Sequence, residues 1–320
     1  RRTLLNHRPK EVLPLQPSVF QETSRFFQTP FVQQAFSFHP LLFGRNPFST
    51  HHRSLMLHAI EQQWGILHVD GGFFQVINVL LDRFQGLGGQ IALNTAIDQI
   101  MMENREAHIL RLKSGKQIHF DTLVSNLSPF LTRQLVNFQN APSPNVQQQQ
   151  STSYYLLHLV FEQERTDFHP HSILATKNFG RYIQQVFNEK QLPEDPWLYL
   201  NAQKPFSNGL QPLMVMTPVP NLGSPVEWEK NTFTFRNRIV EKIAQVIPNL
   251  PERIHYERIS TPVTIQEEYT LPGGSHLLPP IRRTIPNLYY VGDNTWTGLG
   301  LIAALSSAEQ VAKSILAENA

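Results

Sequence analysis

The segment 286–308, near the end of the chain, constrains the fold more than any other part of the sequence. An apolar, β-prone run at 288–291 is followed by Gly292-Asp293, two further glycines, and small and apolar residues at helical spacing. Glycines after a strand let the backbone approach a ligand without an intervening Cβ. The pattern predicts a strand, a glycine-spaced turn and a helix whose N-terminus offers free NH groups to a phosphate or carbonyl.

Asp293 follows the predicted strand directly, where it is suited to accept hydrogen bonds from ligand hydroxyls. The alternative is a strand–helix unit with a glycine-rich turn and no ligand. The shape of the motif alone does not separate these two interpretations.

The same segment resembles the C-terminal flavin motif of bacterial-type phytoene desaturases, V-G-x-x-T-H-P-G-x-G-x-P-x-x-x-x-S-A. It departs from that motif at Trp296, Thr297 and Ile302, where the family has His, Pro and Pro, so the resemblance leaves the substrate and reaction open. It implies an FAD cofactor, and Trp296 on the substrate side. Seven residues match without a gap: Val291, Gly292, Thr295, Gly298, Gly300, Ser307 and Ala308. The implied cofactor contacts are Ile97, Gly292, Asp293, Thr295, Gly298, Gly300, Leu301 and Ile302.

Residues 69–126 predict part of a nucleotide-binding sheet. Apolar residues from Phe73 to Phe84 share one helix face, and the glycines at 86–89 end that helix. The block resembles the same family in G-G-x-x-x-x-x-x-x-L, L-G-G-x-I-x-L-N and D-x-L-V-S-N, which places Ile97 where the family's backbone holds adenine. Plain core packing is the alternative for Ile97. Strands are predicted at 90–93, 99–102, 109–112, 117–120 and 123–124.

Aromatic side chains crowd residues 26–48, including Phe38 and Phe43, which we assign to the substrate side. The segment either lines an apolar substrate channel, touches a membrane surface, or forms the core of a helical subdomain. Downstream, strands are expected at 154–161, 197–200 and 213–217, and a helix at 233–246.

Composition excludes several classes of protein. A net charge of +2 is too balanced for a nucleic-acid binder, and the absence of cysteine rules out disulfides, thiolate catalysis and cysteine-ligated metals. No apolar stretch is long enough to span a membrane. The 13 histidines form no H-E-x-x-H motif, so no metal site is predicted, and a G-x-S-x-G elbow and a P-loop are both missing.

No strand with a G-x-G-x-x-G turn occurs in the chain, although the resemblance implies one for the FAD pyrophosphate. We therefore expect a C-terminal portion of a longer flavoprotein. The expected fold is α/β (mixed α+β): an incomplete Rossmann-like FAD-binding domain with an inserted substrate domain of mixed sheet and helices. The expected division is 1–67 for lid helices of the substrate domain, 68–126 and 271–320 for the FAD-binding domain, and 127–270 for the substrate domain.

The resemblance implies an FAD-dependent oxidoreductase that desaturates a long apolar isoprenoid, such as phytoene or diapophytoene, by hydride transfer to flavin. No residue is identified as the catalytic base. We expect a cytoplasmic protein, with peripheral membrane contact as an option. The alternatives are a carotene isomerase, a retinol-saturase-like enzyme, an amine oxidase, or a non-catalytic fragment that has lost the cofactor half.

Overall fold

The computed structural model describes residues 16–67, 69–136, 151–162, 169–275, 285–292 and 300–318. The chain folds into two compact units, each assembled from segments that are far apart in the sequence. Residues 127–153 and 262–270, assigned above to the substrate domain, belong instead to unit 2. Unit 1 consists of Arg1–Gln63, Tyr154–Pro220 and Ser224–Thr261, and unit 2 of Trp64–Ser153, Asn221–Gly223 and Pro262–Ala320.

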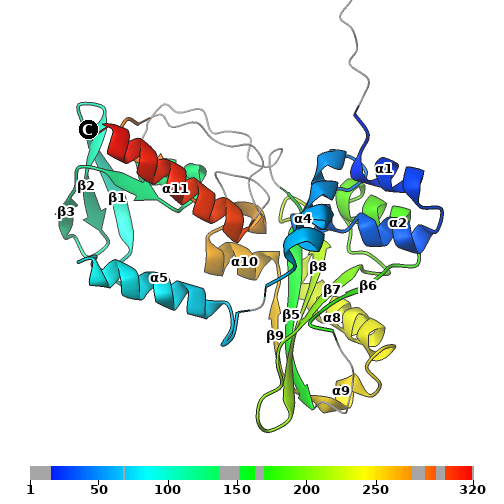
Figure 1. Ribbon diagram of the computed structural model, residues 1–320. Helices are drawn as coiled ribbons and strands as arrows, with labels where there is room; N and C mark the ends of the chain where they lie inside the picture. The colour runs from blue at the N-terminus through cyan, green and yellow to red at the C-terminus, as the bar shows by residue number, and fades with distance from the viewer. Residues whose placement is uncertain are drawn as a thin grey trace, which may run out of the picture. The chain divides into compact units, whose positions relative to one another are not determined.

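Unit 1 is built on a five-stranded sheet in the order β6-β7-β8-β5-β9 (Figure 1). Side chains of the inner strand β5 alternate between buried and more exposed positions, as expected for a sheet with one face against a core. The expected strands at 154–161, 197–200 and 213–217 are therefore confirmed. The strands are β5 (Ser153–Glu162), β6 (His171–Leu174), β7 (Leu198–Ala202), β8 (Leu210–Val219) and β9 (Ile254–Ser260).

The helix α8 (Trp228–Ala244) packs against β5. Tyr155 of β5 donates a hydrogen bond to the carbonyl of Thr232 at 3.0 Å, and its ring meets that of Phe235 edge-on at 5.2 Å. Phe235, Ile239 and Ile243 are buried at the spacing of four residues that the sequence predicts. Two short helices, α7 (Phe179–Ile183) and α9 (Leu250–Arg253), and the π-helical turn η3 (Gln184–Asn188) complete this part of unit 1.

The N-terminal part of unit 1 is a group of short helices. Ser18 and Gln21 form a capping box at the start of α1, and prolines occupy the first turns of α2 and α3. Leu41 of α3 is fully buried in a cluster with Trp197 and residues of α7 and η3. The helices are α1 (Val19–Phe26), α2 (Pro30–Phe36), α3 (His39–Leu42), η1 (His52–Leu55) and α4 (Met56–Trp64).

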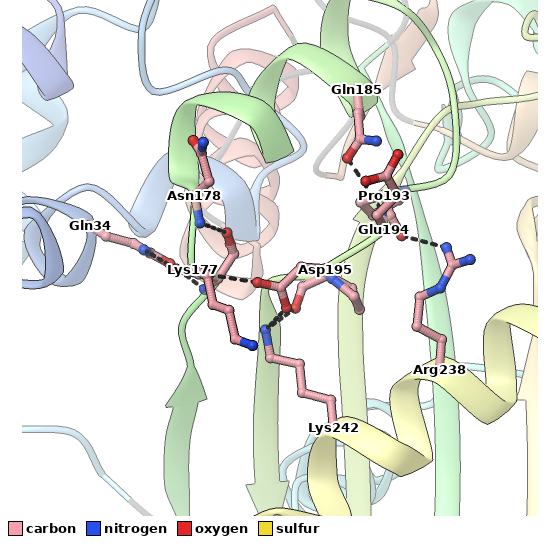
Figure 2. A network of polar contacts seen from close by, with 11 residues as sticks. Gln34, Lys177, Asn178, Gln185, Pro193, Glu194, Asp195, Arg238 and Lys242 are labelled. Carbon is pink, nitrogen blue, oxygen red and sulfur yellow. Dashed lines mark hydrogen bonds and ion pairs between the residues drawn. The ribbon is translucent and has the colours of Figure 1, made fainter.

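A polar network holds the loop before β7 in place (Figure 2). Asp195 accepts hydrogen bonds from Nζ of Lys242 on α8, at 2.5 Å, and from the backbone N–H of Lys177, at 2.6 Å. Lys242 also donates to the carbonyl of Pro196 at 2.8 Å. Trp197, which follows this loop, is thereby held in the core.

Unit 2 contains a three-stranded antiparallel sheet, β1-β2-β3 (Figure 1). It also contains the parallel pair β4–β10. The side-chain amide of Asn287 joins them: it accepts from the N–H of Ala107 at 2.9 Å and donates to the carbonyl of Asp121 at 2.8 Å. The expected hairpin and the strands on either side of it are confirmed. The strands are β1 (Ile97–Glu103), β2 (Glu106–Leu112), β3 (Gln117–His119), β4 (Leu123–Ser125) and β10 (Leu288–Tyr290).

The expected helices of unit 2 are present, but one expected strand is wrong. Residues 90–93 form no strand, because no described strand pairs with them to supply the hydrogen bonds that a strand needs. The helix before them ends at Gly86, as predicted. The helices are α5 (Phe74–Gly86), α6 (Pro129–Leu135), α10 (Pro262–Tyr269), the short η4 (Pro272–Gly274) and α11 (Leu301–Glu318). In the described parts of the chain, no helix is both long and apolar enough to cross a lipid bilayer.

Candidate functional site

The carboxyl ends of β4 and β10 meet at one edge of unit 2. The two strands are parallel and pair from Leu123–Leu288 to Ser125–Tyr290. In open α/β sheets, ligands bind outside the carboxyl ends of parallel strands. This edge is therefore the candidate ligand site, and the residues that follow the two strands form its floor.

Gly292 lies at this edge in a backbone conformation that favours glycine, with φ of +103°. A Cβ at this position would overlap Oδ1 of Asn126, which follows β4. The N–H of Gly292 donates to Oγ of Ser307 at 2.8 Å, and Ser307 donates to the carbonyl of Ala304 at 2.8 Å. These hydrogen bonds connect the end of β10 to α11. Because Gly292 has no side chain, it leaves room for Asn126 at this edge.

A cavity of about 290 Å³ opens beside the end of β4. Aliphatic side chains of β1, β2, β4 and α6 form most of its wall, and Ser125, Asn126 and Thr270 add polar groups. Its volume is at the lower end of the roughly 300–1,000 Å³ that is usual for small-molecule sites. The cavity therefore has room for one ring system or sugar of a dinucleotide.

Ile97, the first residue of β1, is part of the cavity wall. The sequence predicted a cofactor contact at this position, and the structure brings it together with Ser125 and Asn126. Those two residues look like ordinary turn residues in the sequence. The signal that could have found them is their place at the end of a strand that runs parallel to the last one.

Among the described residues that line this cavity there is no Asp, Glu, Lys, Arg or His. Tyr290 of the adjacent strand is buried, and burial raises the pKa of its phenol, which stays protonated near neutral pH. The wall that the described residues form is therefore uncharged. This part of the wall suits an uncharged ring and offers no general base.

Further predicted cofactor residues lie at the start of α11. Gly300 has φ of +53°, and its carbonyl accepts the hydrogen bond from Ala304 that begins the helix, at 3.1 Å. Leu301 is 39 % exposed and Ile302 62 % exposed. Their roles stay predictions. The predicted residues Asp293, Thr295, Trp296 and Gly298 lie outside the described residues.

The aromatic segment of unit 1 divides between core and surface. Phe38 stacks on His39, with ring centroids 4.1 Å apart, and packs against the cluster that contains Trp197. Phe43 is half-buried, whereas Phe26 and Phe31 are 74 % and 63 % exposed. The segment thus contributes to a helical core and also leaves apolar rings on the surface. Whether Phe38 and Phe43 face a substrate stays a prediction.

Three features of this edge fit one part of a flavin nucleotide: the uncharged wall, the polar groups at its end and the absence of a Cβ at Gly292. Comparison with known proteins indicates the same class of cofactor. The family model described as "Flavin containing amine oxidoreductase" matches residues 15–316. A phytoene desaturase (lycopene-forming) of Pseudescherichia vulneris is 28 % identical over 324 residues, which cover 93 % of this chain and 66 % of the relative. A 4,4'-diapophytoene desaturase (4,4'-diapolycopene-forming) of Methylomonas sp is 26 % identical over 323 residues, which cover 93 % of this chain and 63 % of the relative.

Among solved structures, a triple mutant of putrescine oxidase with redesigned cofactor binding is similar in fold, with a TM-score of 0.59 and 14 % identity. The similarity covers 95 % of this chain and 68 % of that chain. With respect to the two desaturases above, this chain spans 66 % and 63 % of their length, which is slightly less than two thirds.

Proposed function

The chain belongs to the flavin containing amine oxidoreductase family, and from that premise we propose that it acts in the FAD-dependent desaturation of a long apolar isoprenoid. The similarity to desaturases of phytoene and of 4,4'-diapophytoene over 93 % of the chain carries this proposal. A flavin cofactor follows from membership of the family. FAD, rather than FMN, is part of the proposal.

The cavity beside β4 supports FAD in particular. FAD contains an adenine that FMN lacks, and the aliphatic wall around Ile97 suits a flat, uncharged ring. Ser125 and Asn126 bring polar groups to the same cavity, where they would bind the attached sugar or a ring nitrogen. In this proposal Gly292 leaves room for the cofactor at the end of β10.

When bound, the flavin supplies a hydride acceptor for oxidation of a carbon–carbon single bond. The residues of the chain contribute binding and orientation. An isoprenoid offers no charged group, so its affinity must come from apolar burial, about 0.8 kcal/mol per CH₂. The half-buried rings of Phe38 and Phe43 are the substrate-side groups that we assign, and no described residue is assigned as the base.

Peripheral contact with a membrane is a further part of the proposal, because the substrate dissolves in lipid. Phe26 at the end of α1 and Phe31 in α2 expose apolar rings, and Arg25, next to Phe26 in the sequence, is 68 % exposed and pairs with Glu22 at 3.0 Å. Exposed aromatic rings are suited to the headgroup region of a bilayer. Sedimentation with anionic vesicles tests this, and Phe26→Ser with Phe31→Ser should reduce the bound fraction.

The cofactor is tested by extracting flavin from the purified native protein and separating FAD from FMN by chromatography. Ile97→Asn should lower flavin content, whereas the matched change Ile118→Asn, at an exposed position of the same sheet, should leave it unchanged. Recovery of FMN alone would contradict the adenine assignment, and recovery of no flavin would contradict a working flavoenzyme.

The reaction is tested separately, by product analysis after incubation with phytoene or diapophytoene in liposomes. Conversion to more conjugated products supports the desaturase. If the protein retains flavin but converts neither substrate, the desaturase proposal fails and an isomerase or amine oxidase activity is the next to assay.

A further inference from the structure

Three side chains with metal-binding atoms meet in unit 1, on the helices α3 and α4. His39 is the first residue of α3, and His58 and Glu61 lie one turn apart on α4. In the described part of the chain, no other group of three or more His, Asp or Glu side chains meets in this way. The sequence pattern does not reveal the group, because the two histidines lie 19 residues apart.

The hydrogen bonds fix which nitrogen of His39 carries a proton. Nε2 of His39 lies 2.8 Å from Oε1 of Glu61. An ionised carboxylate only accepts hydrogen bonds, so His39 donates from Nε2, and its Nδ1 presents a lone pair. That lone pair faces Nε2 of His58 at 3.2 Å.

The second histidine completes a pair of nitrogens directed at each other. Nε2 of His58 also lies 3.0 Å from the carbonyl oxygen of Phe36. In the absence of a metal, one proton on Nε2 of His58 satisfies both neighbours. A metal ion that displaces this proton would find two imidazole nitrogens and a carbonyl oxygen around it.

The spacing fits a tetrahedral ion. Two nitrogens that each lie about 2.0–2.1 Å from zinc are roughly 3.3 Å apart in a tetrahedral site, close to the 3.2 Å between the two histidines. A ligating histidine usually donates its other N–H to a carboxylate, which is the position that Glu61 holds. Glu61 is therefore the positioning residue of such a site.

The surroundings enclose the side chain of His39. It is only 4 % exposed. The rings of Phe36 and Phe38 lie 5.0 and 5.6 Å from that of His58 and limit access of water. Imidazole ligands favour zinc, copper, nickel and iron over magnesium or calcium.

We propose that Nδ1 of His39 and Nε2 of His58 bind a divalent transition-metal ion of the zinc type, with Glu61 orienting His39. The carbonyl of Phe36 and water complete the coordination. Because one ligand lies on α3 and the other on α4, the ion joins these two helices and stabilises unit 1. The proposal is independent of the flavin and of the desaturation.

The test uses the 320-residue chain after dialysis against EDTA, titrated with Co²⁺ and then with Zn²⁺ in competition. We expect one equivalent of Co²⁺ to give the visible absorption of a tetrahedral site, and Zn²⁺ to abolish it and raise the melting temperature. His58→Gln should remove both effects, and Glu61→Gln should weaken binding roughly 10–100-fold.

His52→Gln is the matched control, because His51 and His52 form another pair of stacked rings, 4.4 Å apart, in the same unit. It should bind Co²⁺ like the wild type. Absence of binding by the wild type, or equal binding by His58→Gln, would overturn the proposal. Should His58→Gln fail to fold by near-ultraviolet circular dichroism, the affinity of Glu61→Gln decides: an affinity equal to that of the wild type rejects the site.

Discussion

Asp195 should matter more to the stability of unit 1 than its partner Lys242. The side chain of Lys242 is 13 % exposed and that of Asp195 is 37 % exposed. Replacing Asp195 with Asn leaves a buried ammonium group that still donates to the carbonyl of Pro196 but has lost its counter-charge. Replacing Lys242 with Met removes the buried charge itself, and Asp195 keeps the N–H of Lys177 as a donor.

The two costs can be estimated from burial. Breaking a fully buried pair costs about 3–5 kcal/mol, but the partial exposure of Asp195 screens the charge, so we expect about 2 kcal/mol for Asp195→Asn. Burial lowers the pKa of Lys242 although Asp195 raises it. The unfavourable desolvation of the ammonium group therefore exceeds its favourable interaction with Asp195. The free energy of unfolding of Lys242→Met should therefore lie within about 1 kcal/mol of that of the wild type. The double mutant should have the same stability as Lys242→Met.

Urea unfolding followed by tryptophan fluorescence measures these free energies. Trp197 is fully buried two residues after Asp195 and reports on unit 1. Lys230→Met is the control, since Lys230 lies on the same helix with its side chain 76 % exposed, and its loss should cost little. A larger cost for Lys242→Met than for Asp195→Asn would refute the reasoning.

Three further predictions concern residues of the candidate site and of the polar network around Asp195. Gly292→Ala should destabilise unit 2 by about 1–3 kcal/mol, because its φ of +103° is a conformation that a residue with a Cβ rarely adopts; a melting temperature equal to that of the wild type would contradict this. Ser307→Ala should cost about 1 kcal/mol by removing the hydrogen bond that the N–H of Gly292 donates to Oγ of Ser307, whereas Ser314→Ala on the exposed side of α11 should be neutral in urea unfolding. Because its pKa is lowered by burial, Lys242 releases its proton at lower pH in the folded than in the unfolded chain. The stability of the wild type relative to Lys242→Met should therefore rise as the pH approaches 10.5. If this difference in stability fell instead, the pKa of Lys242 would not be lowered in the folded chain.

Local periodicity predicted most of the described strands and the three longest helices, α5, α8 and α11, whereas the shorter helices were not assigned one by one. The helix α8 shows its buried face at Phe235, Ile239 and Ile243, and the hairpin at Ser114-Gly115 follows from two alternating runs around a turn. These elements are determined by residues that are neighbours in the sequence. These elements could therefore be assigned without knowing which parts of the chain pack against them.

Contacts between distant residues were harder to predict. Residues 90–93 have the composition of a strand, but a strand also needs a neighbour, which a single sequence does not supply. Asn126 has the character of a turn residue until β10 is placed beside β4. In the same way, His39, His58 and Glu61 become a group only when α3 and α4 are folded.

The pairing of β5 with β9 determines the order in which the chain folds with least loss of entropy. If unit 1 is unfolded, the hydrogen bond from Asn287 to Asp121 closes a loop of 166 residues. Once β5 and β9 pair, Leu156 and Ser260 lie opposite each other. The loop that remains to be closed is then about 60 residues long, and closing it costs roughly 0.9 kcal/mol less. Unit 1 should therefore fold first, and the edge between β4 and β10 should assemble after it.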